Sequence, residues 1–338
     1  MELGLTTFAE TYPDPITHAT IDHGTRLRQV LAEVELAEQV GLAVYGVGEH
    51  HRADFAASAP AVVLAVAAGR TSRIRLTPAV TVLSSDDPVR VYQQFATLDL
   101  LSAGRVELLV GRGSFIESFP LFGYDLGDYE DLFAEKLDLL LAIRDHERVT
   151  WQGRFRAPLR DQAVYPRSHQ DPLPVWVGVG GTPASVVRAA ERGLPMALAI
   201  IGGEPARFAA LADLHRRVVA DSGHPPQPVA VHAHGFLADT DTGAADAYFP
   251  SYAAAMSRLG RERGWGPMTR QQYDLMRGPE GSLVLGSSDT VAAKLRRWRE
   301  VLGIDRFMLH VSVGTLPHEQ VLRSIELLGT EVAERLEV

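Results

Sequence analysis

Hydrophobic and polar positions follow a repeated order along this chain, in which a short apolar run precedes a longer amphipathic stretch. The run Leu3 to Phe8 is typical of a buried strand. The stretch Asp22 to Gln39 then places Val30 and Val34 at helical spacing, and Gly41 ends it. The pattern therefore predicts a strand followed by a helix at the start of the sequence.

The same order recurs to the end of the chain. Further strands are predicted at about 43–47, 74–83, 105–110, 174–179, 195–201, 229–237 and 306–311. Further helices are predicted at about 59–69, from 87 onward, and at 128–146, 182–192, 204–221, 288–301 and 317–335. Alternating strands and helices require parallel pairing through right-handed crossovers, and about eight such units usually close into a barrel. We expect an α/β fold of the (β/α)₈ TIM-barrel type, with an open doubly wound sheet as the alternative.

One region interrupts the alternation. Residues 239–286 contain a helical segment from Ala244 to Arg263, followed by two turn-rich stretches around Trp265 and Gly278. We interpret the region as an insertion after the seventh strand, where it would lie at the carboxyl-terminal face of the barrel. The expected organisation is a single domain over residues 1–338.

Composition and charge narrow the functional classes. The 338 residues are 46% hydrophobic and 22% charged, which is typical of a globular chain. The net charge of -9 and the absence of a basic block argue against a nucleic-acid partner. The chain has no cysteine, so disulfides, thiolate metal sites and a cysteine nucleophile are excluded. We found no signal peptide and no membrane-spanning run, and we expect a cytoplasmic protein.

Three groups of residues stand at predicted strand ends, which open onto one face of a barrel. The first is Gly48-Glu49-His50-His51, where His50 could act as a base or hydrogen-bond donor and the adjacent Glu49 is the second catalytic candidate. Glycines at 46 and 48 on the same side of the strand would leave room for a planar ligand. The alternative is that the histidines only bond loop backbone groups.

The second group is Gly104-Arg105 with Gly111-Arg112-Gly113, at the two ends of the fourth strand. An arginine flanked by glycines can clamp an oxyanion, although a salt bridge at the barrel rim would use the same residues.

The third group is the strongest signal of the three. Gly180 and Gly181 follow a strand and precede Thr182, the expected N-cap of a helix that also carries Ser185 in its first turn. Free N–H groups and hydroxyls at a helix start suit a phosphate. An ordinary capped helix is the alternative, but it gives no reason for two glycines.

Taken together, these segments resemble the luciferase-like flavin monooxygenases over nearly the whole chain. The resemblance rests on GEHH at 48–51, DPVRVYQQFATLDLLSAGR at 87–105, LLVGRG at 108–113, PVWVGVGGTPASVVRAAERGLP at 174–195 and GIDRFMLH at 303–310. It implies a barrel that binds reduced FMN, with the phosphate near Arg112, Gly180, Gly181, Thr182 and Ser185. It also implies that His50 matches the family's catalytic histidine. Such proteins commonly receive reduced flavin from a separate reductase or use NAD(P)H directly, and many are dimers.

Some positions depart from the family pattern. Gly111 stands where the luciferase subunit has a reactive cysteine, and Glu130 stands where it has a further phosphate-binding arginine. Light emission is therefore not implied. The family often has a non-prolyl cis peptide near Ala79 and Val80, under the flavin ring.

Phe8, Phe115 and Phe119 follow strand ends, and we expect them to line an apolar substrate pocket, with plain packing as the alternative.

The predicted function is oxygenation of a small organic substrate, such as an aldehyde or another apolar carbonyl compound, by reduced FMN and O₂. One alternative is hydride transfer with the deazaflavin F420 in the same barrel. Another is a metal-dependent hydrolase, because His232 and His234 share one face of a strand and His50, His51 and His310 end other strands. This reading lacks an acidic bridging ligand on the first strand, and we expect no metal. A flavin carrier without turnover is the last alternative.

Overall fold

The structure is a computed structural model that describes residues 1–337. Parallel strands close into a barrel because β8 pairs with both β7 and β9, and β11 pairs with both β9 and β1. The barrel strands are β1 (Glu2–Thr7), β2 (Val44–Val47), β3 (Arg75–Val82), β4 (Leu108–Gly111), β7 (Val175–Val179), β8 (Met196–Ala199), β9 (Val229–Leu237) and β11 (Arg306–His310). The predicted (β/α)₈ barrel is confirmed.

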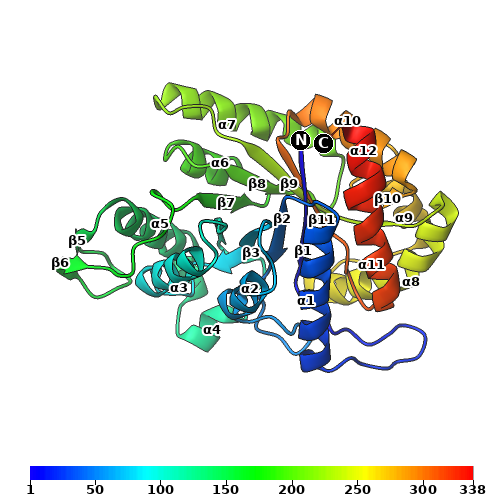
Figure 1. The fold of residues 1–338 in the computed structure, drawn as a ribbon, viewed down its shortest axis with the longest axis horizontal. Coiled ribbons are helices and arrows are strands. Elements are labelled where there is room, and N and C mark those ends of the chain that lie inside the picture. Colours follow the sequence, from blue (N-terminus) through cyan, green and yellow to red (C-terminus); the bar gives the residue numbers. More distant parts are fainter. Residues whose placement is uncertain (338) are drawn as a thin grey trace.

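Helices cover the outside of the barrel, and both chain ends lie close together at one end of it (Figure 1). The helices are α1 (His23–Gln39), α2 (Pro60–Ala68), α3 (Pro88–Leu101), α4 (Ser118–Phe122), α5 (Tyr129–Asp145), α6 (Pro183–Ala190), α7 (Ala209–Asp221), α8 (Asp241–Arg263), α9 (Arg270–Arg277), α10 (Ser288–Leu302), α11 (His318–Leu327) and α12 (Ala333–Leu336). Three shorter helical turns are η1 (Leu126–Asp128), η2 (Pro205–Phe208) and η3 (Leu328–Val332). Over residues 1–337, none of the helices combines the length and apolar character that a membrane crossing requires.

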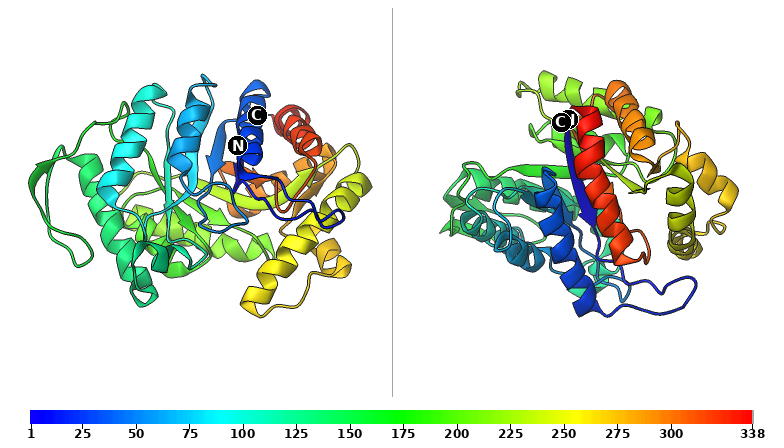
Figure 2. Two further views of the ribbon diagram at one scale, coloured as in Figure 1. Left: turned by 90° about the horizontal axis from the view of Figure 1, so that it is seen from below. Right: turned by 45° about the vertical axis from the view of Figure 1, so that its right-hand side comes forward.

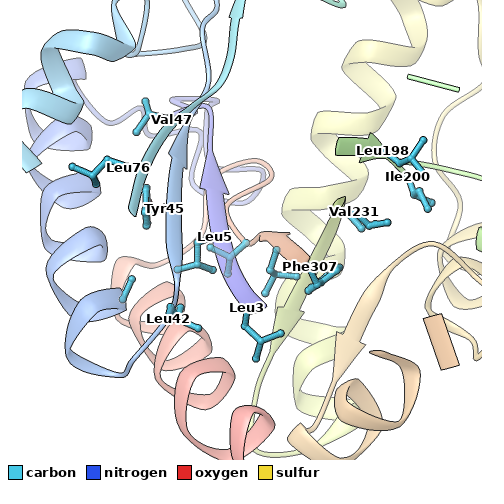
Figure 3. Packing of buried hydrophobic residues seen from close by; sticks show 14 of the residues in the cluster. Leu3, Leu5, Leu42, Tyr45, Val47, Leu76, Leu198, Ile200, Val231 and Phe307 are labelled. Atoms are coloured by element: carbon cyan, nitrogen blue, oxygen red, sulfur yellow. The ribbon is translucent and has the colours of Figure 1, made fainter. Parts of the chain in front are cut away.

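The main core lies between the strands and the helices. Leu3 and Leu5 of β1 are buried, and Leu3 is paired across the sheet with Phe307 of β11. Figure 3 shows these side chains together, with Tyr45 of β2 nearby. Most residues of the barrel strands are buried because a parallel barrel strand is covered on both faces.

A separate group of side chains fills the amino-terminal end of the barrel. Trp176 packs there with Leu109, and the Arg306 guanidinium lies 4.5 Å from the centre of the Trp176 ring. Arg306 also donates to Glu107 at 3.0 Å. Trp176, Arg306 and Glu107 lie at or near the amino-terminal starts of their strands and close that end of the barrel, so a ligand cavity has to open at the carboxyl end.

The fourth strand begins later than the sequence predicts, at Leu108 and not at Arg105. Arg105 donates to the backbone oxygens of Ala68 and Ile74, both at 3.0 Å. It therefore ties the end of α2 to the start of β3, at the amino-terminal end of the barrel. The interpretation of Gly104-Arg105 as part of an oxyanion clamp is wrong.

Additional elements decorate the barrel. An antiparallel hairpin, β5 (Arg148–Trp151) and β6 (Leu159–Ala163), projects beside α5 (Figure 1). Residues 239–286 hold α8, α9 and the short strand β10 (Val284–Gly286), which pairs in parallel with the carboxyl end of β9.

The helix α8 lies beside the loop that follows β1 (Figure 2). Arg258 of α8 donates to Asp54 at 2.8 Å, and Glu262 accepts from Arg52 at 2.7 Å. These ion pairs hold the end of α8 against the loop after β2, at the carboxyl-terminal face where the sequence placed the insertion.

Candidate functional site

A cavity of about 270 Å³ opens at the carboxyl ends of the barrel strands. It is bounded by strand ends and by the loop after β4, which is the arrangement expected for a barrel active site. The lining residues are Thr6, Phe8, Glu49, His50, His51, Ala79, Val80, Val82, Leu109, Gly111, Arg112, Gly113, Ser114, Phe115, Glu117, Ser118, Tyr129, Gly178, Val179, Gly180, Ala197, Ala199, Ile201, His232 and Met308.

The floor of the cavity is shaped by β3. The peptide bond between Ala79 and Val80 is cis, at the place that the family resemblance implied. A Cβ added at Gly111 would stand 2.8 Å from the Val80 side chain, and one added at Gly178 would stand 2.9 Å from it. These two glycines therefore give Val80 its space in the barrel.

Gly46 of β2 and Gly48 just after it serve a different purpose from the one the sequence suggested. A Cβ at Gly46 would stand 2.8 Å from Ala79, and a Cβ at Gly48 would overlap the Phe8 ring at 2.1 Å. Protein atoms, and not a planar ligand, occupy the room that these glycines leave.

His50 stands at the end of β2 in an apolar surrounding. Its ring centre lies 4.6 Å from Phe8, 4.4 Å from Phe55 and 4.6 Å from Phe115. Burial, helped by the nearby His310, His51 and Arg52, lowers the pKa of His50 to about 3. The imidazole is therefore neutral near pH 7. Its Nε2 atom is buried with no hydrogen-bond partner in the described chain, and Nδ1 lies 3.9 Å from Glu117.

Glu49 uses its carboxylate within the protein. One oxygen lies 2.8 Å from His51 Nε2, and the other accepts from the backbone N–H of Val82 at 3.0 Å. The side chain therefore anchors the end of β3 against β2. Glu49, a catalytic candidate from the sequence, lines the cavity, and both of its carboxylate oxygens are engaged by protein groups.

Arg112 follows β4 and reaches the end of the cavity nearest α6. It forms an ion pair with Glu130, and its guanidinium lies 5.0 Å from the centre of the Tyr129 ring. Arg188 of α6 donates to the other oxygen of Glu130 at 2.8 Å. Two guanidinium groups from different elements thus meet at one carboxylate.

The glycines before α6 stand beside this pair of arginines. Gly180 lines the cavity, and a Cβ added there would have no protein atom within 4 Å. Gly181 has φ of +112°, a conformation that favours glycine. Thr182 and Pro183 occupy the predicted N-cap and first helical positions. The Thr182 hydroxyl lies 2.7 Å from the Ser185 hydroxyl and makes no capping bond to the backbone, so the helix start keeps donors for a ligand.

The three phenylalanines separate. Phe8 and Phe115 line the cavity and contact His50. Phe119 lies in α4 with 1% of its surface exposed, and its ring centre is 5.5 Å from that of Tyr129. It supports the cavity wall from behind and does not line it.

Sequence reasoning missed three polar residues of this region, in part or entirely. Arg188 and Glu117 were not considered, and His232 was considered only as a metal ligand. His232 lines the cavity, and its Nε2 atom is buried without a hydrogen-bond partner in the described chain. Burial and the nearby His310 lower the pKa of His232 to about 3, so it is neutral. The alternation in His232-Ala233-His234 was a usable signal, since it points both imidazoles into the barrel.

The histidines of the barrel were also candidates for metal ligands. His310 is held by Glu10 at 2.6 Å and by Thr6 at 3.2 Å. Within residues 1–337, no three His, Asp or Glu side chains are placed to bind one metal ion.

The family model described as luciferase-like monooxygenase matches residues 1–306. An uncharacterized protein of Sinorhizobium fredii, y4vJ, is 25% identical over 322 residues, which cover 90% of each chain.

Two solved structures show the same fold with different cofactors. The oxygenating constituent of 3,6-diketocamphane monooxygenase from Pseudomonas putida, a type II Baeyer–Villiger monooxygenase in complex with FMN, is 20% identical. It has a TM-score of 0.79 and covers 99% of this chain and 98% of its own. An F420-dependent secondary alcohol dehydrogenase with an F420–acetone adduct is 17% identical, with a TM-score of 0.78 and coverage of 99% and 98%.

Proposed function

Because the chain belongs to the luciferase-like monooxygenase family, and is an oxidoreductase on that ground, we propose that it uses reduced FMN and O₂ to oxygenate a small organic substrate. We propose an apolar or carbonyl-bearing compound such as an aldehyde, because Phe8, Phe115 and Met308 give the cavity an apolar wall. The FMN complex of the similar 3,6-diketocamphane monooxygenase supports the choice of cofactor.

The observation that carries the proposal is that an unpartnered His50 Nε2 lies in the same cavity as Arg112 and Gly180, and that Gly180 leads into the open start of α6. A buried polar atom without a partner is costly, so a ligand that bonds to it is favoured. The residues present fit FMN: Arg112, Gly180, Gly181, Thr182 and Ser185 would hold the phosphate. Ala79 and Val80 would support the flavin ring.

Bound reduced flavin supplies the electrons that activate oxygen. The protein contributes positioning and exclusion of water. His50 is neutral, so it can donate one hydrogen bond to reacting oxygen atoms or accept one from them without placing a full charge in the cavity. Phe8 and Phe115 contact His50 on two sides and limit access of water to it.

A flavin titration tests the proposal. Purified protein is titrated with oxidised and then reduced FMN, followed by flavin absorbance and tryptophan quenching. We expect saturable binding that Arg112→Ala weakens about tenfold or more, since a charge-assisted contact to phosphate is lost. Absence of binding to either form would contradict the proposal.

Turnover by the loaded protein tests the role of His50. His50→Ala should keep flavin bound and lower kcat by about 100-fold or more, as is usual when a proton-handling group is removed. Undiminished turnover would show that His50 has no catalytic role. Saturable FMN binding without substrate-dependent oxygen uptake would indicate a flavin carrier.

The second candidate is hydride transfer with F420. The structurally similar secondary alcohol dehydrogenase binds F420 in the same fold. An F420-dependent glucose-6-phosphate dehydrogenase of Amycolatopsis mediterranei is 33% identical over 154 residues, which cover 43% of this chain and 45% of its own. Titration with F420 separates the two. Tight F420 binding with no FMN binding would transfer the proposal to the deazaflavin.

Two partners complete the proposal: a separate flavin reductase as the source of reduced FMN, and a second copy of the chain in a homodimer. Direct use of NAD(P)H is the alternative to the reductase, and stopped-flow reduction of bound FMN by NADH or NADPH distinguishes them.

A further inference from the structure

Glu130 lies between a pair of arginines, Arg112 and Arg188, of which Arg112 lines the cavity. It lies in the first turn of α5, and its two carboxylate oxygens accept from Arg112 of the loop after β4 and from Arg188 of α6. The two arginine side chains are only 17% and 15% exposed, whereas the glutamate side chain is 53% exposed. The guanidinium groups are therefore fixed by the fold, and the carboxylate reaches them from the solvent side.

The two arginines form an anion-binding site, and the Glu130 carboxylate occupies it. Two guanidinium groups that converge on one pair of oxygens are suited to carboxylate or phosphate. Arg188 keeps a further nitrogen, Nη1, that is buried and has no hydrogen-bond partner in the described chain. A carboxylate offers two oxygens and a single charge. A phosphate offers three terminal oxygens and more charge, so it could satisfy the donor that Glu130 leaves unpaired.

We infer that Glu130 is an internal competitor for the phosphate of the cofactor. Its carboxylate pairs with Arg112 and Arg188 in the free protein and has to leave them when a phosphate binds. This inference rests on the proposed function, and it names the residue that sets cofactor affinity. Rotation of Glu130 into water is easy because half of its side chain is already exposed. The consequence is a cofactor held weakly enough to exchange, as suits a reduced flavin delivered by another protein.

The test compares two flavins that differ only in the phosphate. Kd is measured for FMN and for riboflavin by flavin fluorescence, on wild-type protein and on Glu130→Gln. We expect the variant to bind FMN about three- to tenfold more tightly, because a half-exposed ion pair contributes little and its competition is correspondingly modest. Riboflavin affinity should not change.

A matched control comes from the next residue. Asp131→Asn removes the same charge from the same helix turn, but the Asp131 carboxylate is 73% exposed and lies 3.7 Å from Arg154, not from the arginine pair. The control should leave FMN affinity at the wild-type value. In the double variant Glu130→Gln with Arg188→Ala, the gain in FMN affinity should disappear, since the second guanidinium is missing.

Two results would overturn the inference. One is an equal gain in FMN affinity for Glu130→Gln and Asp131→Asn, which would indicate a general charge effect. The other is an equal gain for FMN and riboflavin, which would mean that Glu130 does not act on the phosphate.

Failure of the proposed function is recognised separately. If no flavin binds to wild type or variant, inorganic phosphate serves as the probe, and its effect on the melting temperature is measured. A larger rise in melting temperature with phosphate for Glu130→Gln than for wild type would support competition between Glu130 and the phosphate of a different ligand. Equal stabilisation would reject it.

Discussion

At Gly180 the main chain faces the cavity, and a side chain there would meet no protein atom within 4 Å. Gly180 does not adopt a left-handed conformation, so alanine fits the backbone. We therefore predict that Gly180→Ala leaves the free energy of unfolding nearly unchanged. It should weaken FMN binding about tenfold or more, because the added methyl group takes space that the cofactor needs close to the backbone.

Gly202 offers the control for this prediction. A Cβ at Gly202 also meets nothing within 4 Å, but Gly202 does not line the cavity. Urea unfolding and FMN titration are measured on both alanine variants. If Gly180→Ala binds FMN as well as Gly202→Ala does, the phosphate lies elsewhere.

The sequence could predict the position of a single site residue where that residue follows the end of a predicted strand. His50 and Arg112 follow apolar runs directly, and both line the cavity. Arg188 lies inside an amphipathic helix, where an arginine carries no distinguishing signal, and its role depends on which face of α6 turns toward β4. The sequence around Phe115 and Phe119 does not distinguish the two side chains. The path of α4 decides that Phe119 is buried away from the cavity.

At the scale of elements, hydrophobic periodicity predicted each barrel strand because each is buried on both faces. It could not predict the hairpin β5–β6, whose second strand, Leu159–Ala163, has three exposed residues in a row and no alternation. The sequence interpretation assigned the space at Gly46 and Gly48 to a ligand. Sequence spacing does not show that Ala79 of the neighbouring β3 fills the space at Gly46, or that Phe8, just after β1, fills the space at Gly48.

The strand β9 makes stability depend on pH. Burial lowers the pKa of His232 to about 3 and the pKa of His234 well below its usual value, and both side chains are neutral in the folded barrel. In the unfolded chain they titrate near pH 6.5. Because the unfolded state binds more protons below that pH, the free energy of unfolding should fall as the pH drops from about 6.5 toward 4, and stay level above it.

The expected slope is about 1 kcal/mol per pH unit for each such histidine. Urea denaturation between pH 8 and pH 4.5 measures it. His232→Asn removes one titrating group, so its curve should be less steep than that of wild type whatever its stability at pH 8. An unchanged slope would mean that His232 is protonated in the fold.

At the scale of the molecule, the barrel explains how residues 50, 112, 180 and 232 reach one cavity although they are far apart in sequence. The closed sheet follows from the alternation of strands and helices, which the sequence shows plainly. Whether the chain is a single domain, and whether it forms a dimer, depends on surfaces that periodicity does not describe. Both remain predictions.

The dimer prediction can be assigned to one surface, formed by α2 and the end of α3. The helix α2 reads PAVVLAVAA and has no polar face, and its Val62 and Val66 are 66% and 46% exposed. Leu101, at the end of the neighbouring α3, is 72% exposed. Burial of such an exposed apolar patch against another apolar surface is favourable. A second copy satisfies this requirement, since a two-fold axis places the same patch on both sides.

Val62→Asp tests that surface, because two charges would be buried across the two-fold axis without partners. We predict that wild type sediments as a dimer and that Val62→Asp sediments as a monomer at micromolar concentration. Ile16→Asp, at a 77% exposed apolar residue in the loop after β1, should remain dimeric. A monomeric wild type would remove the dimer from the proposal, and a dimeric Val62→Asp would place the interface on another face of the barrel.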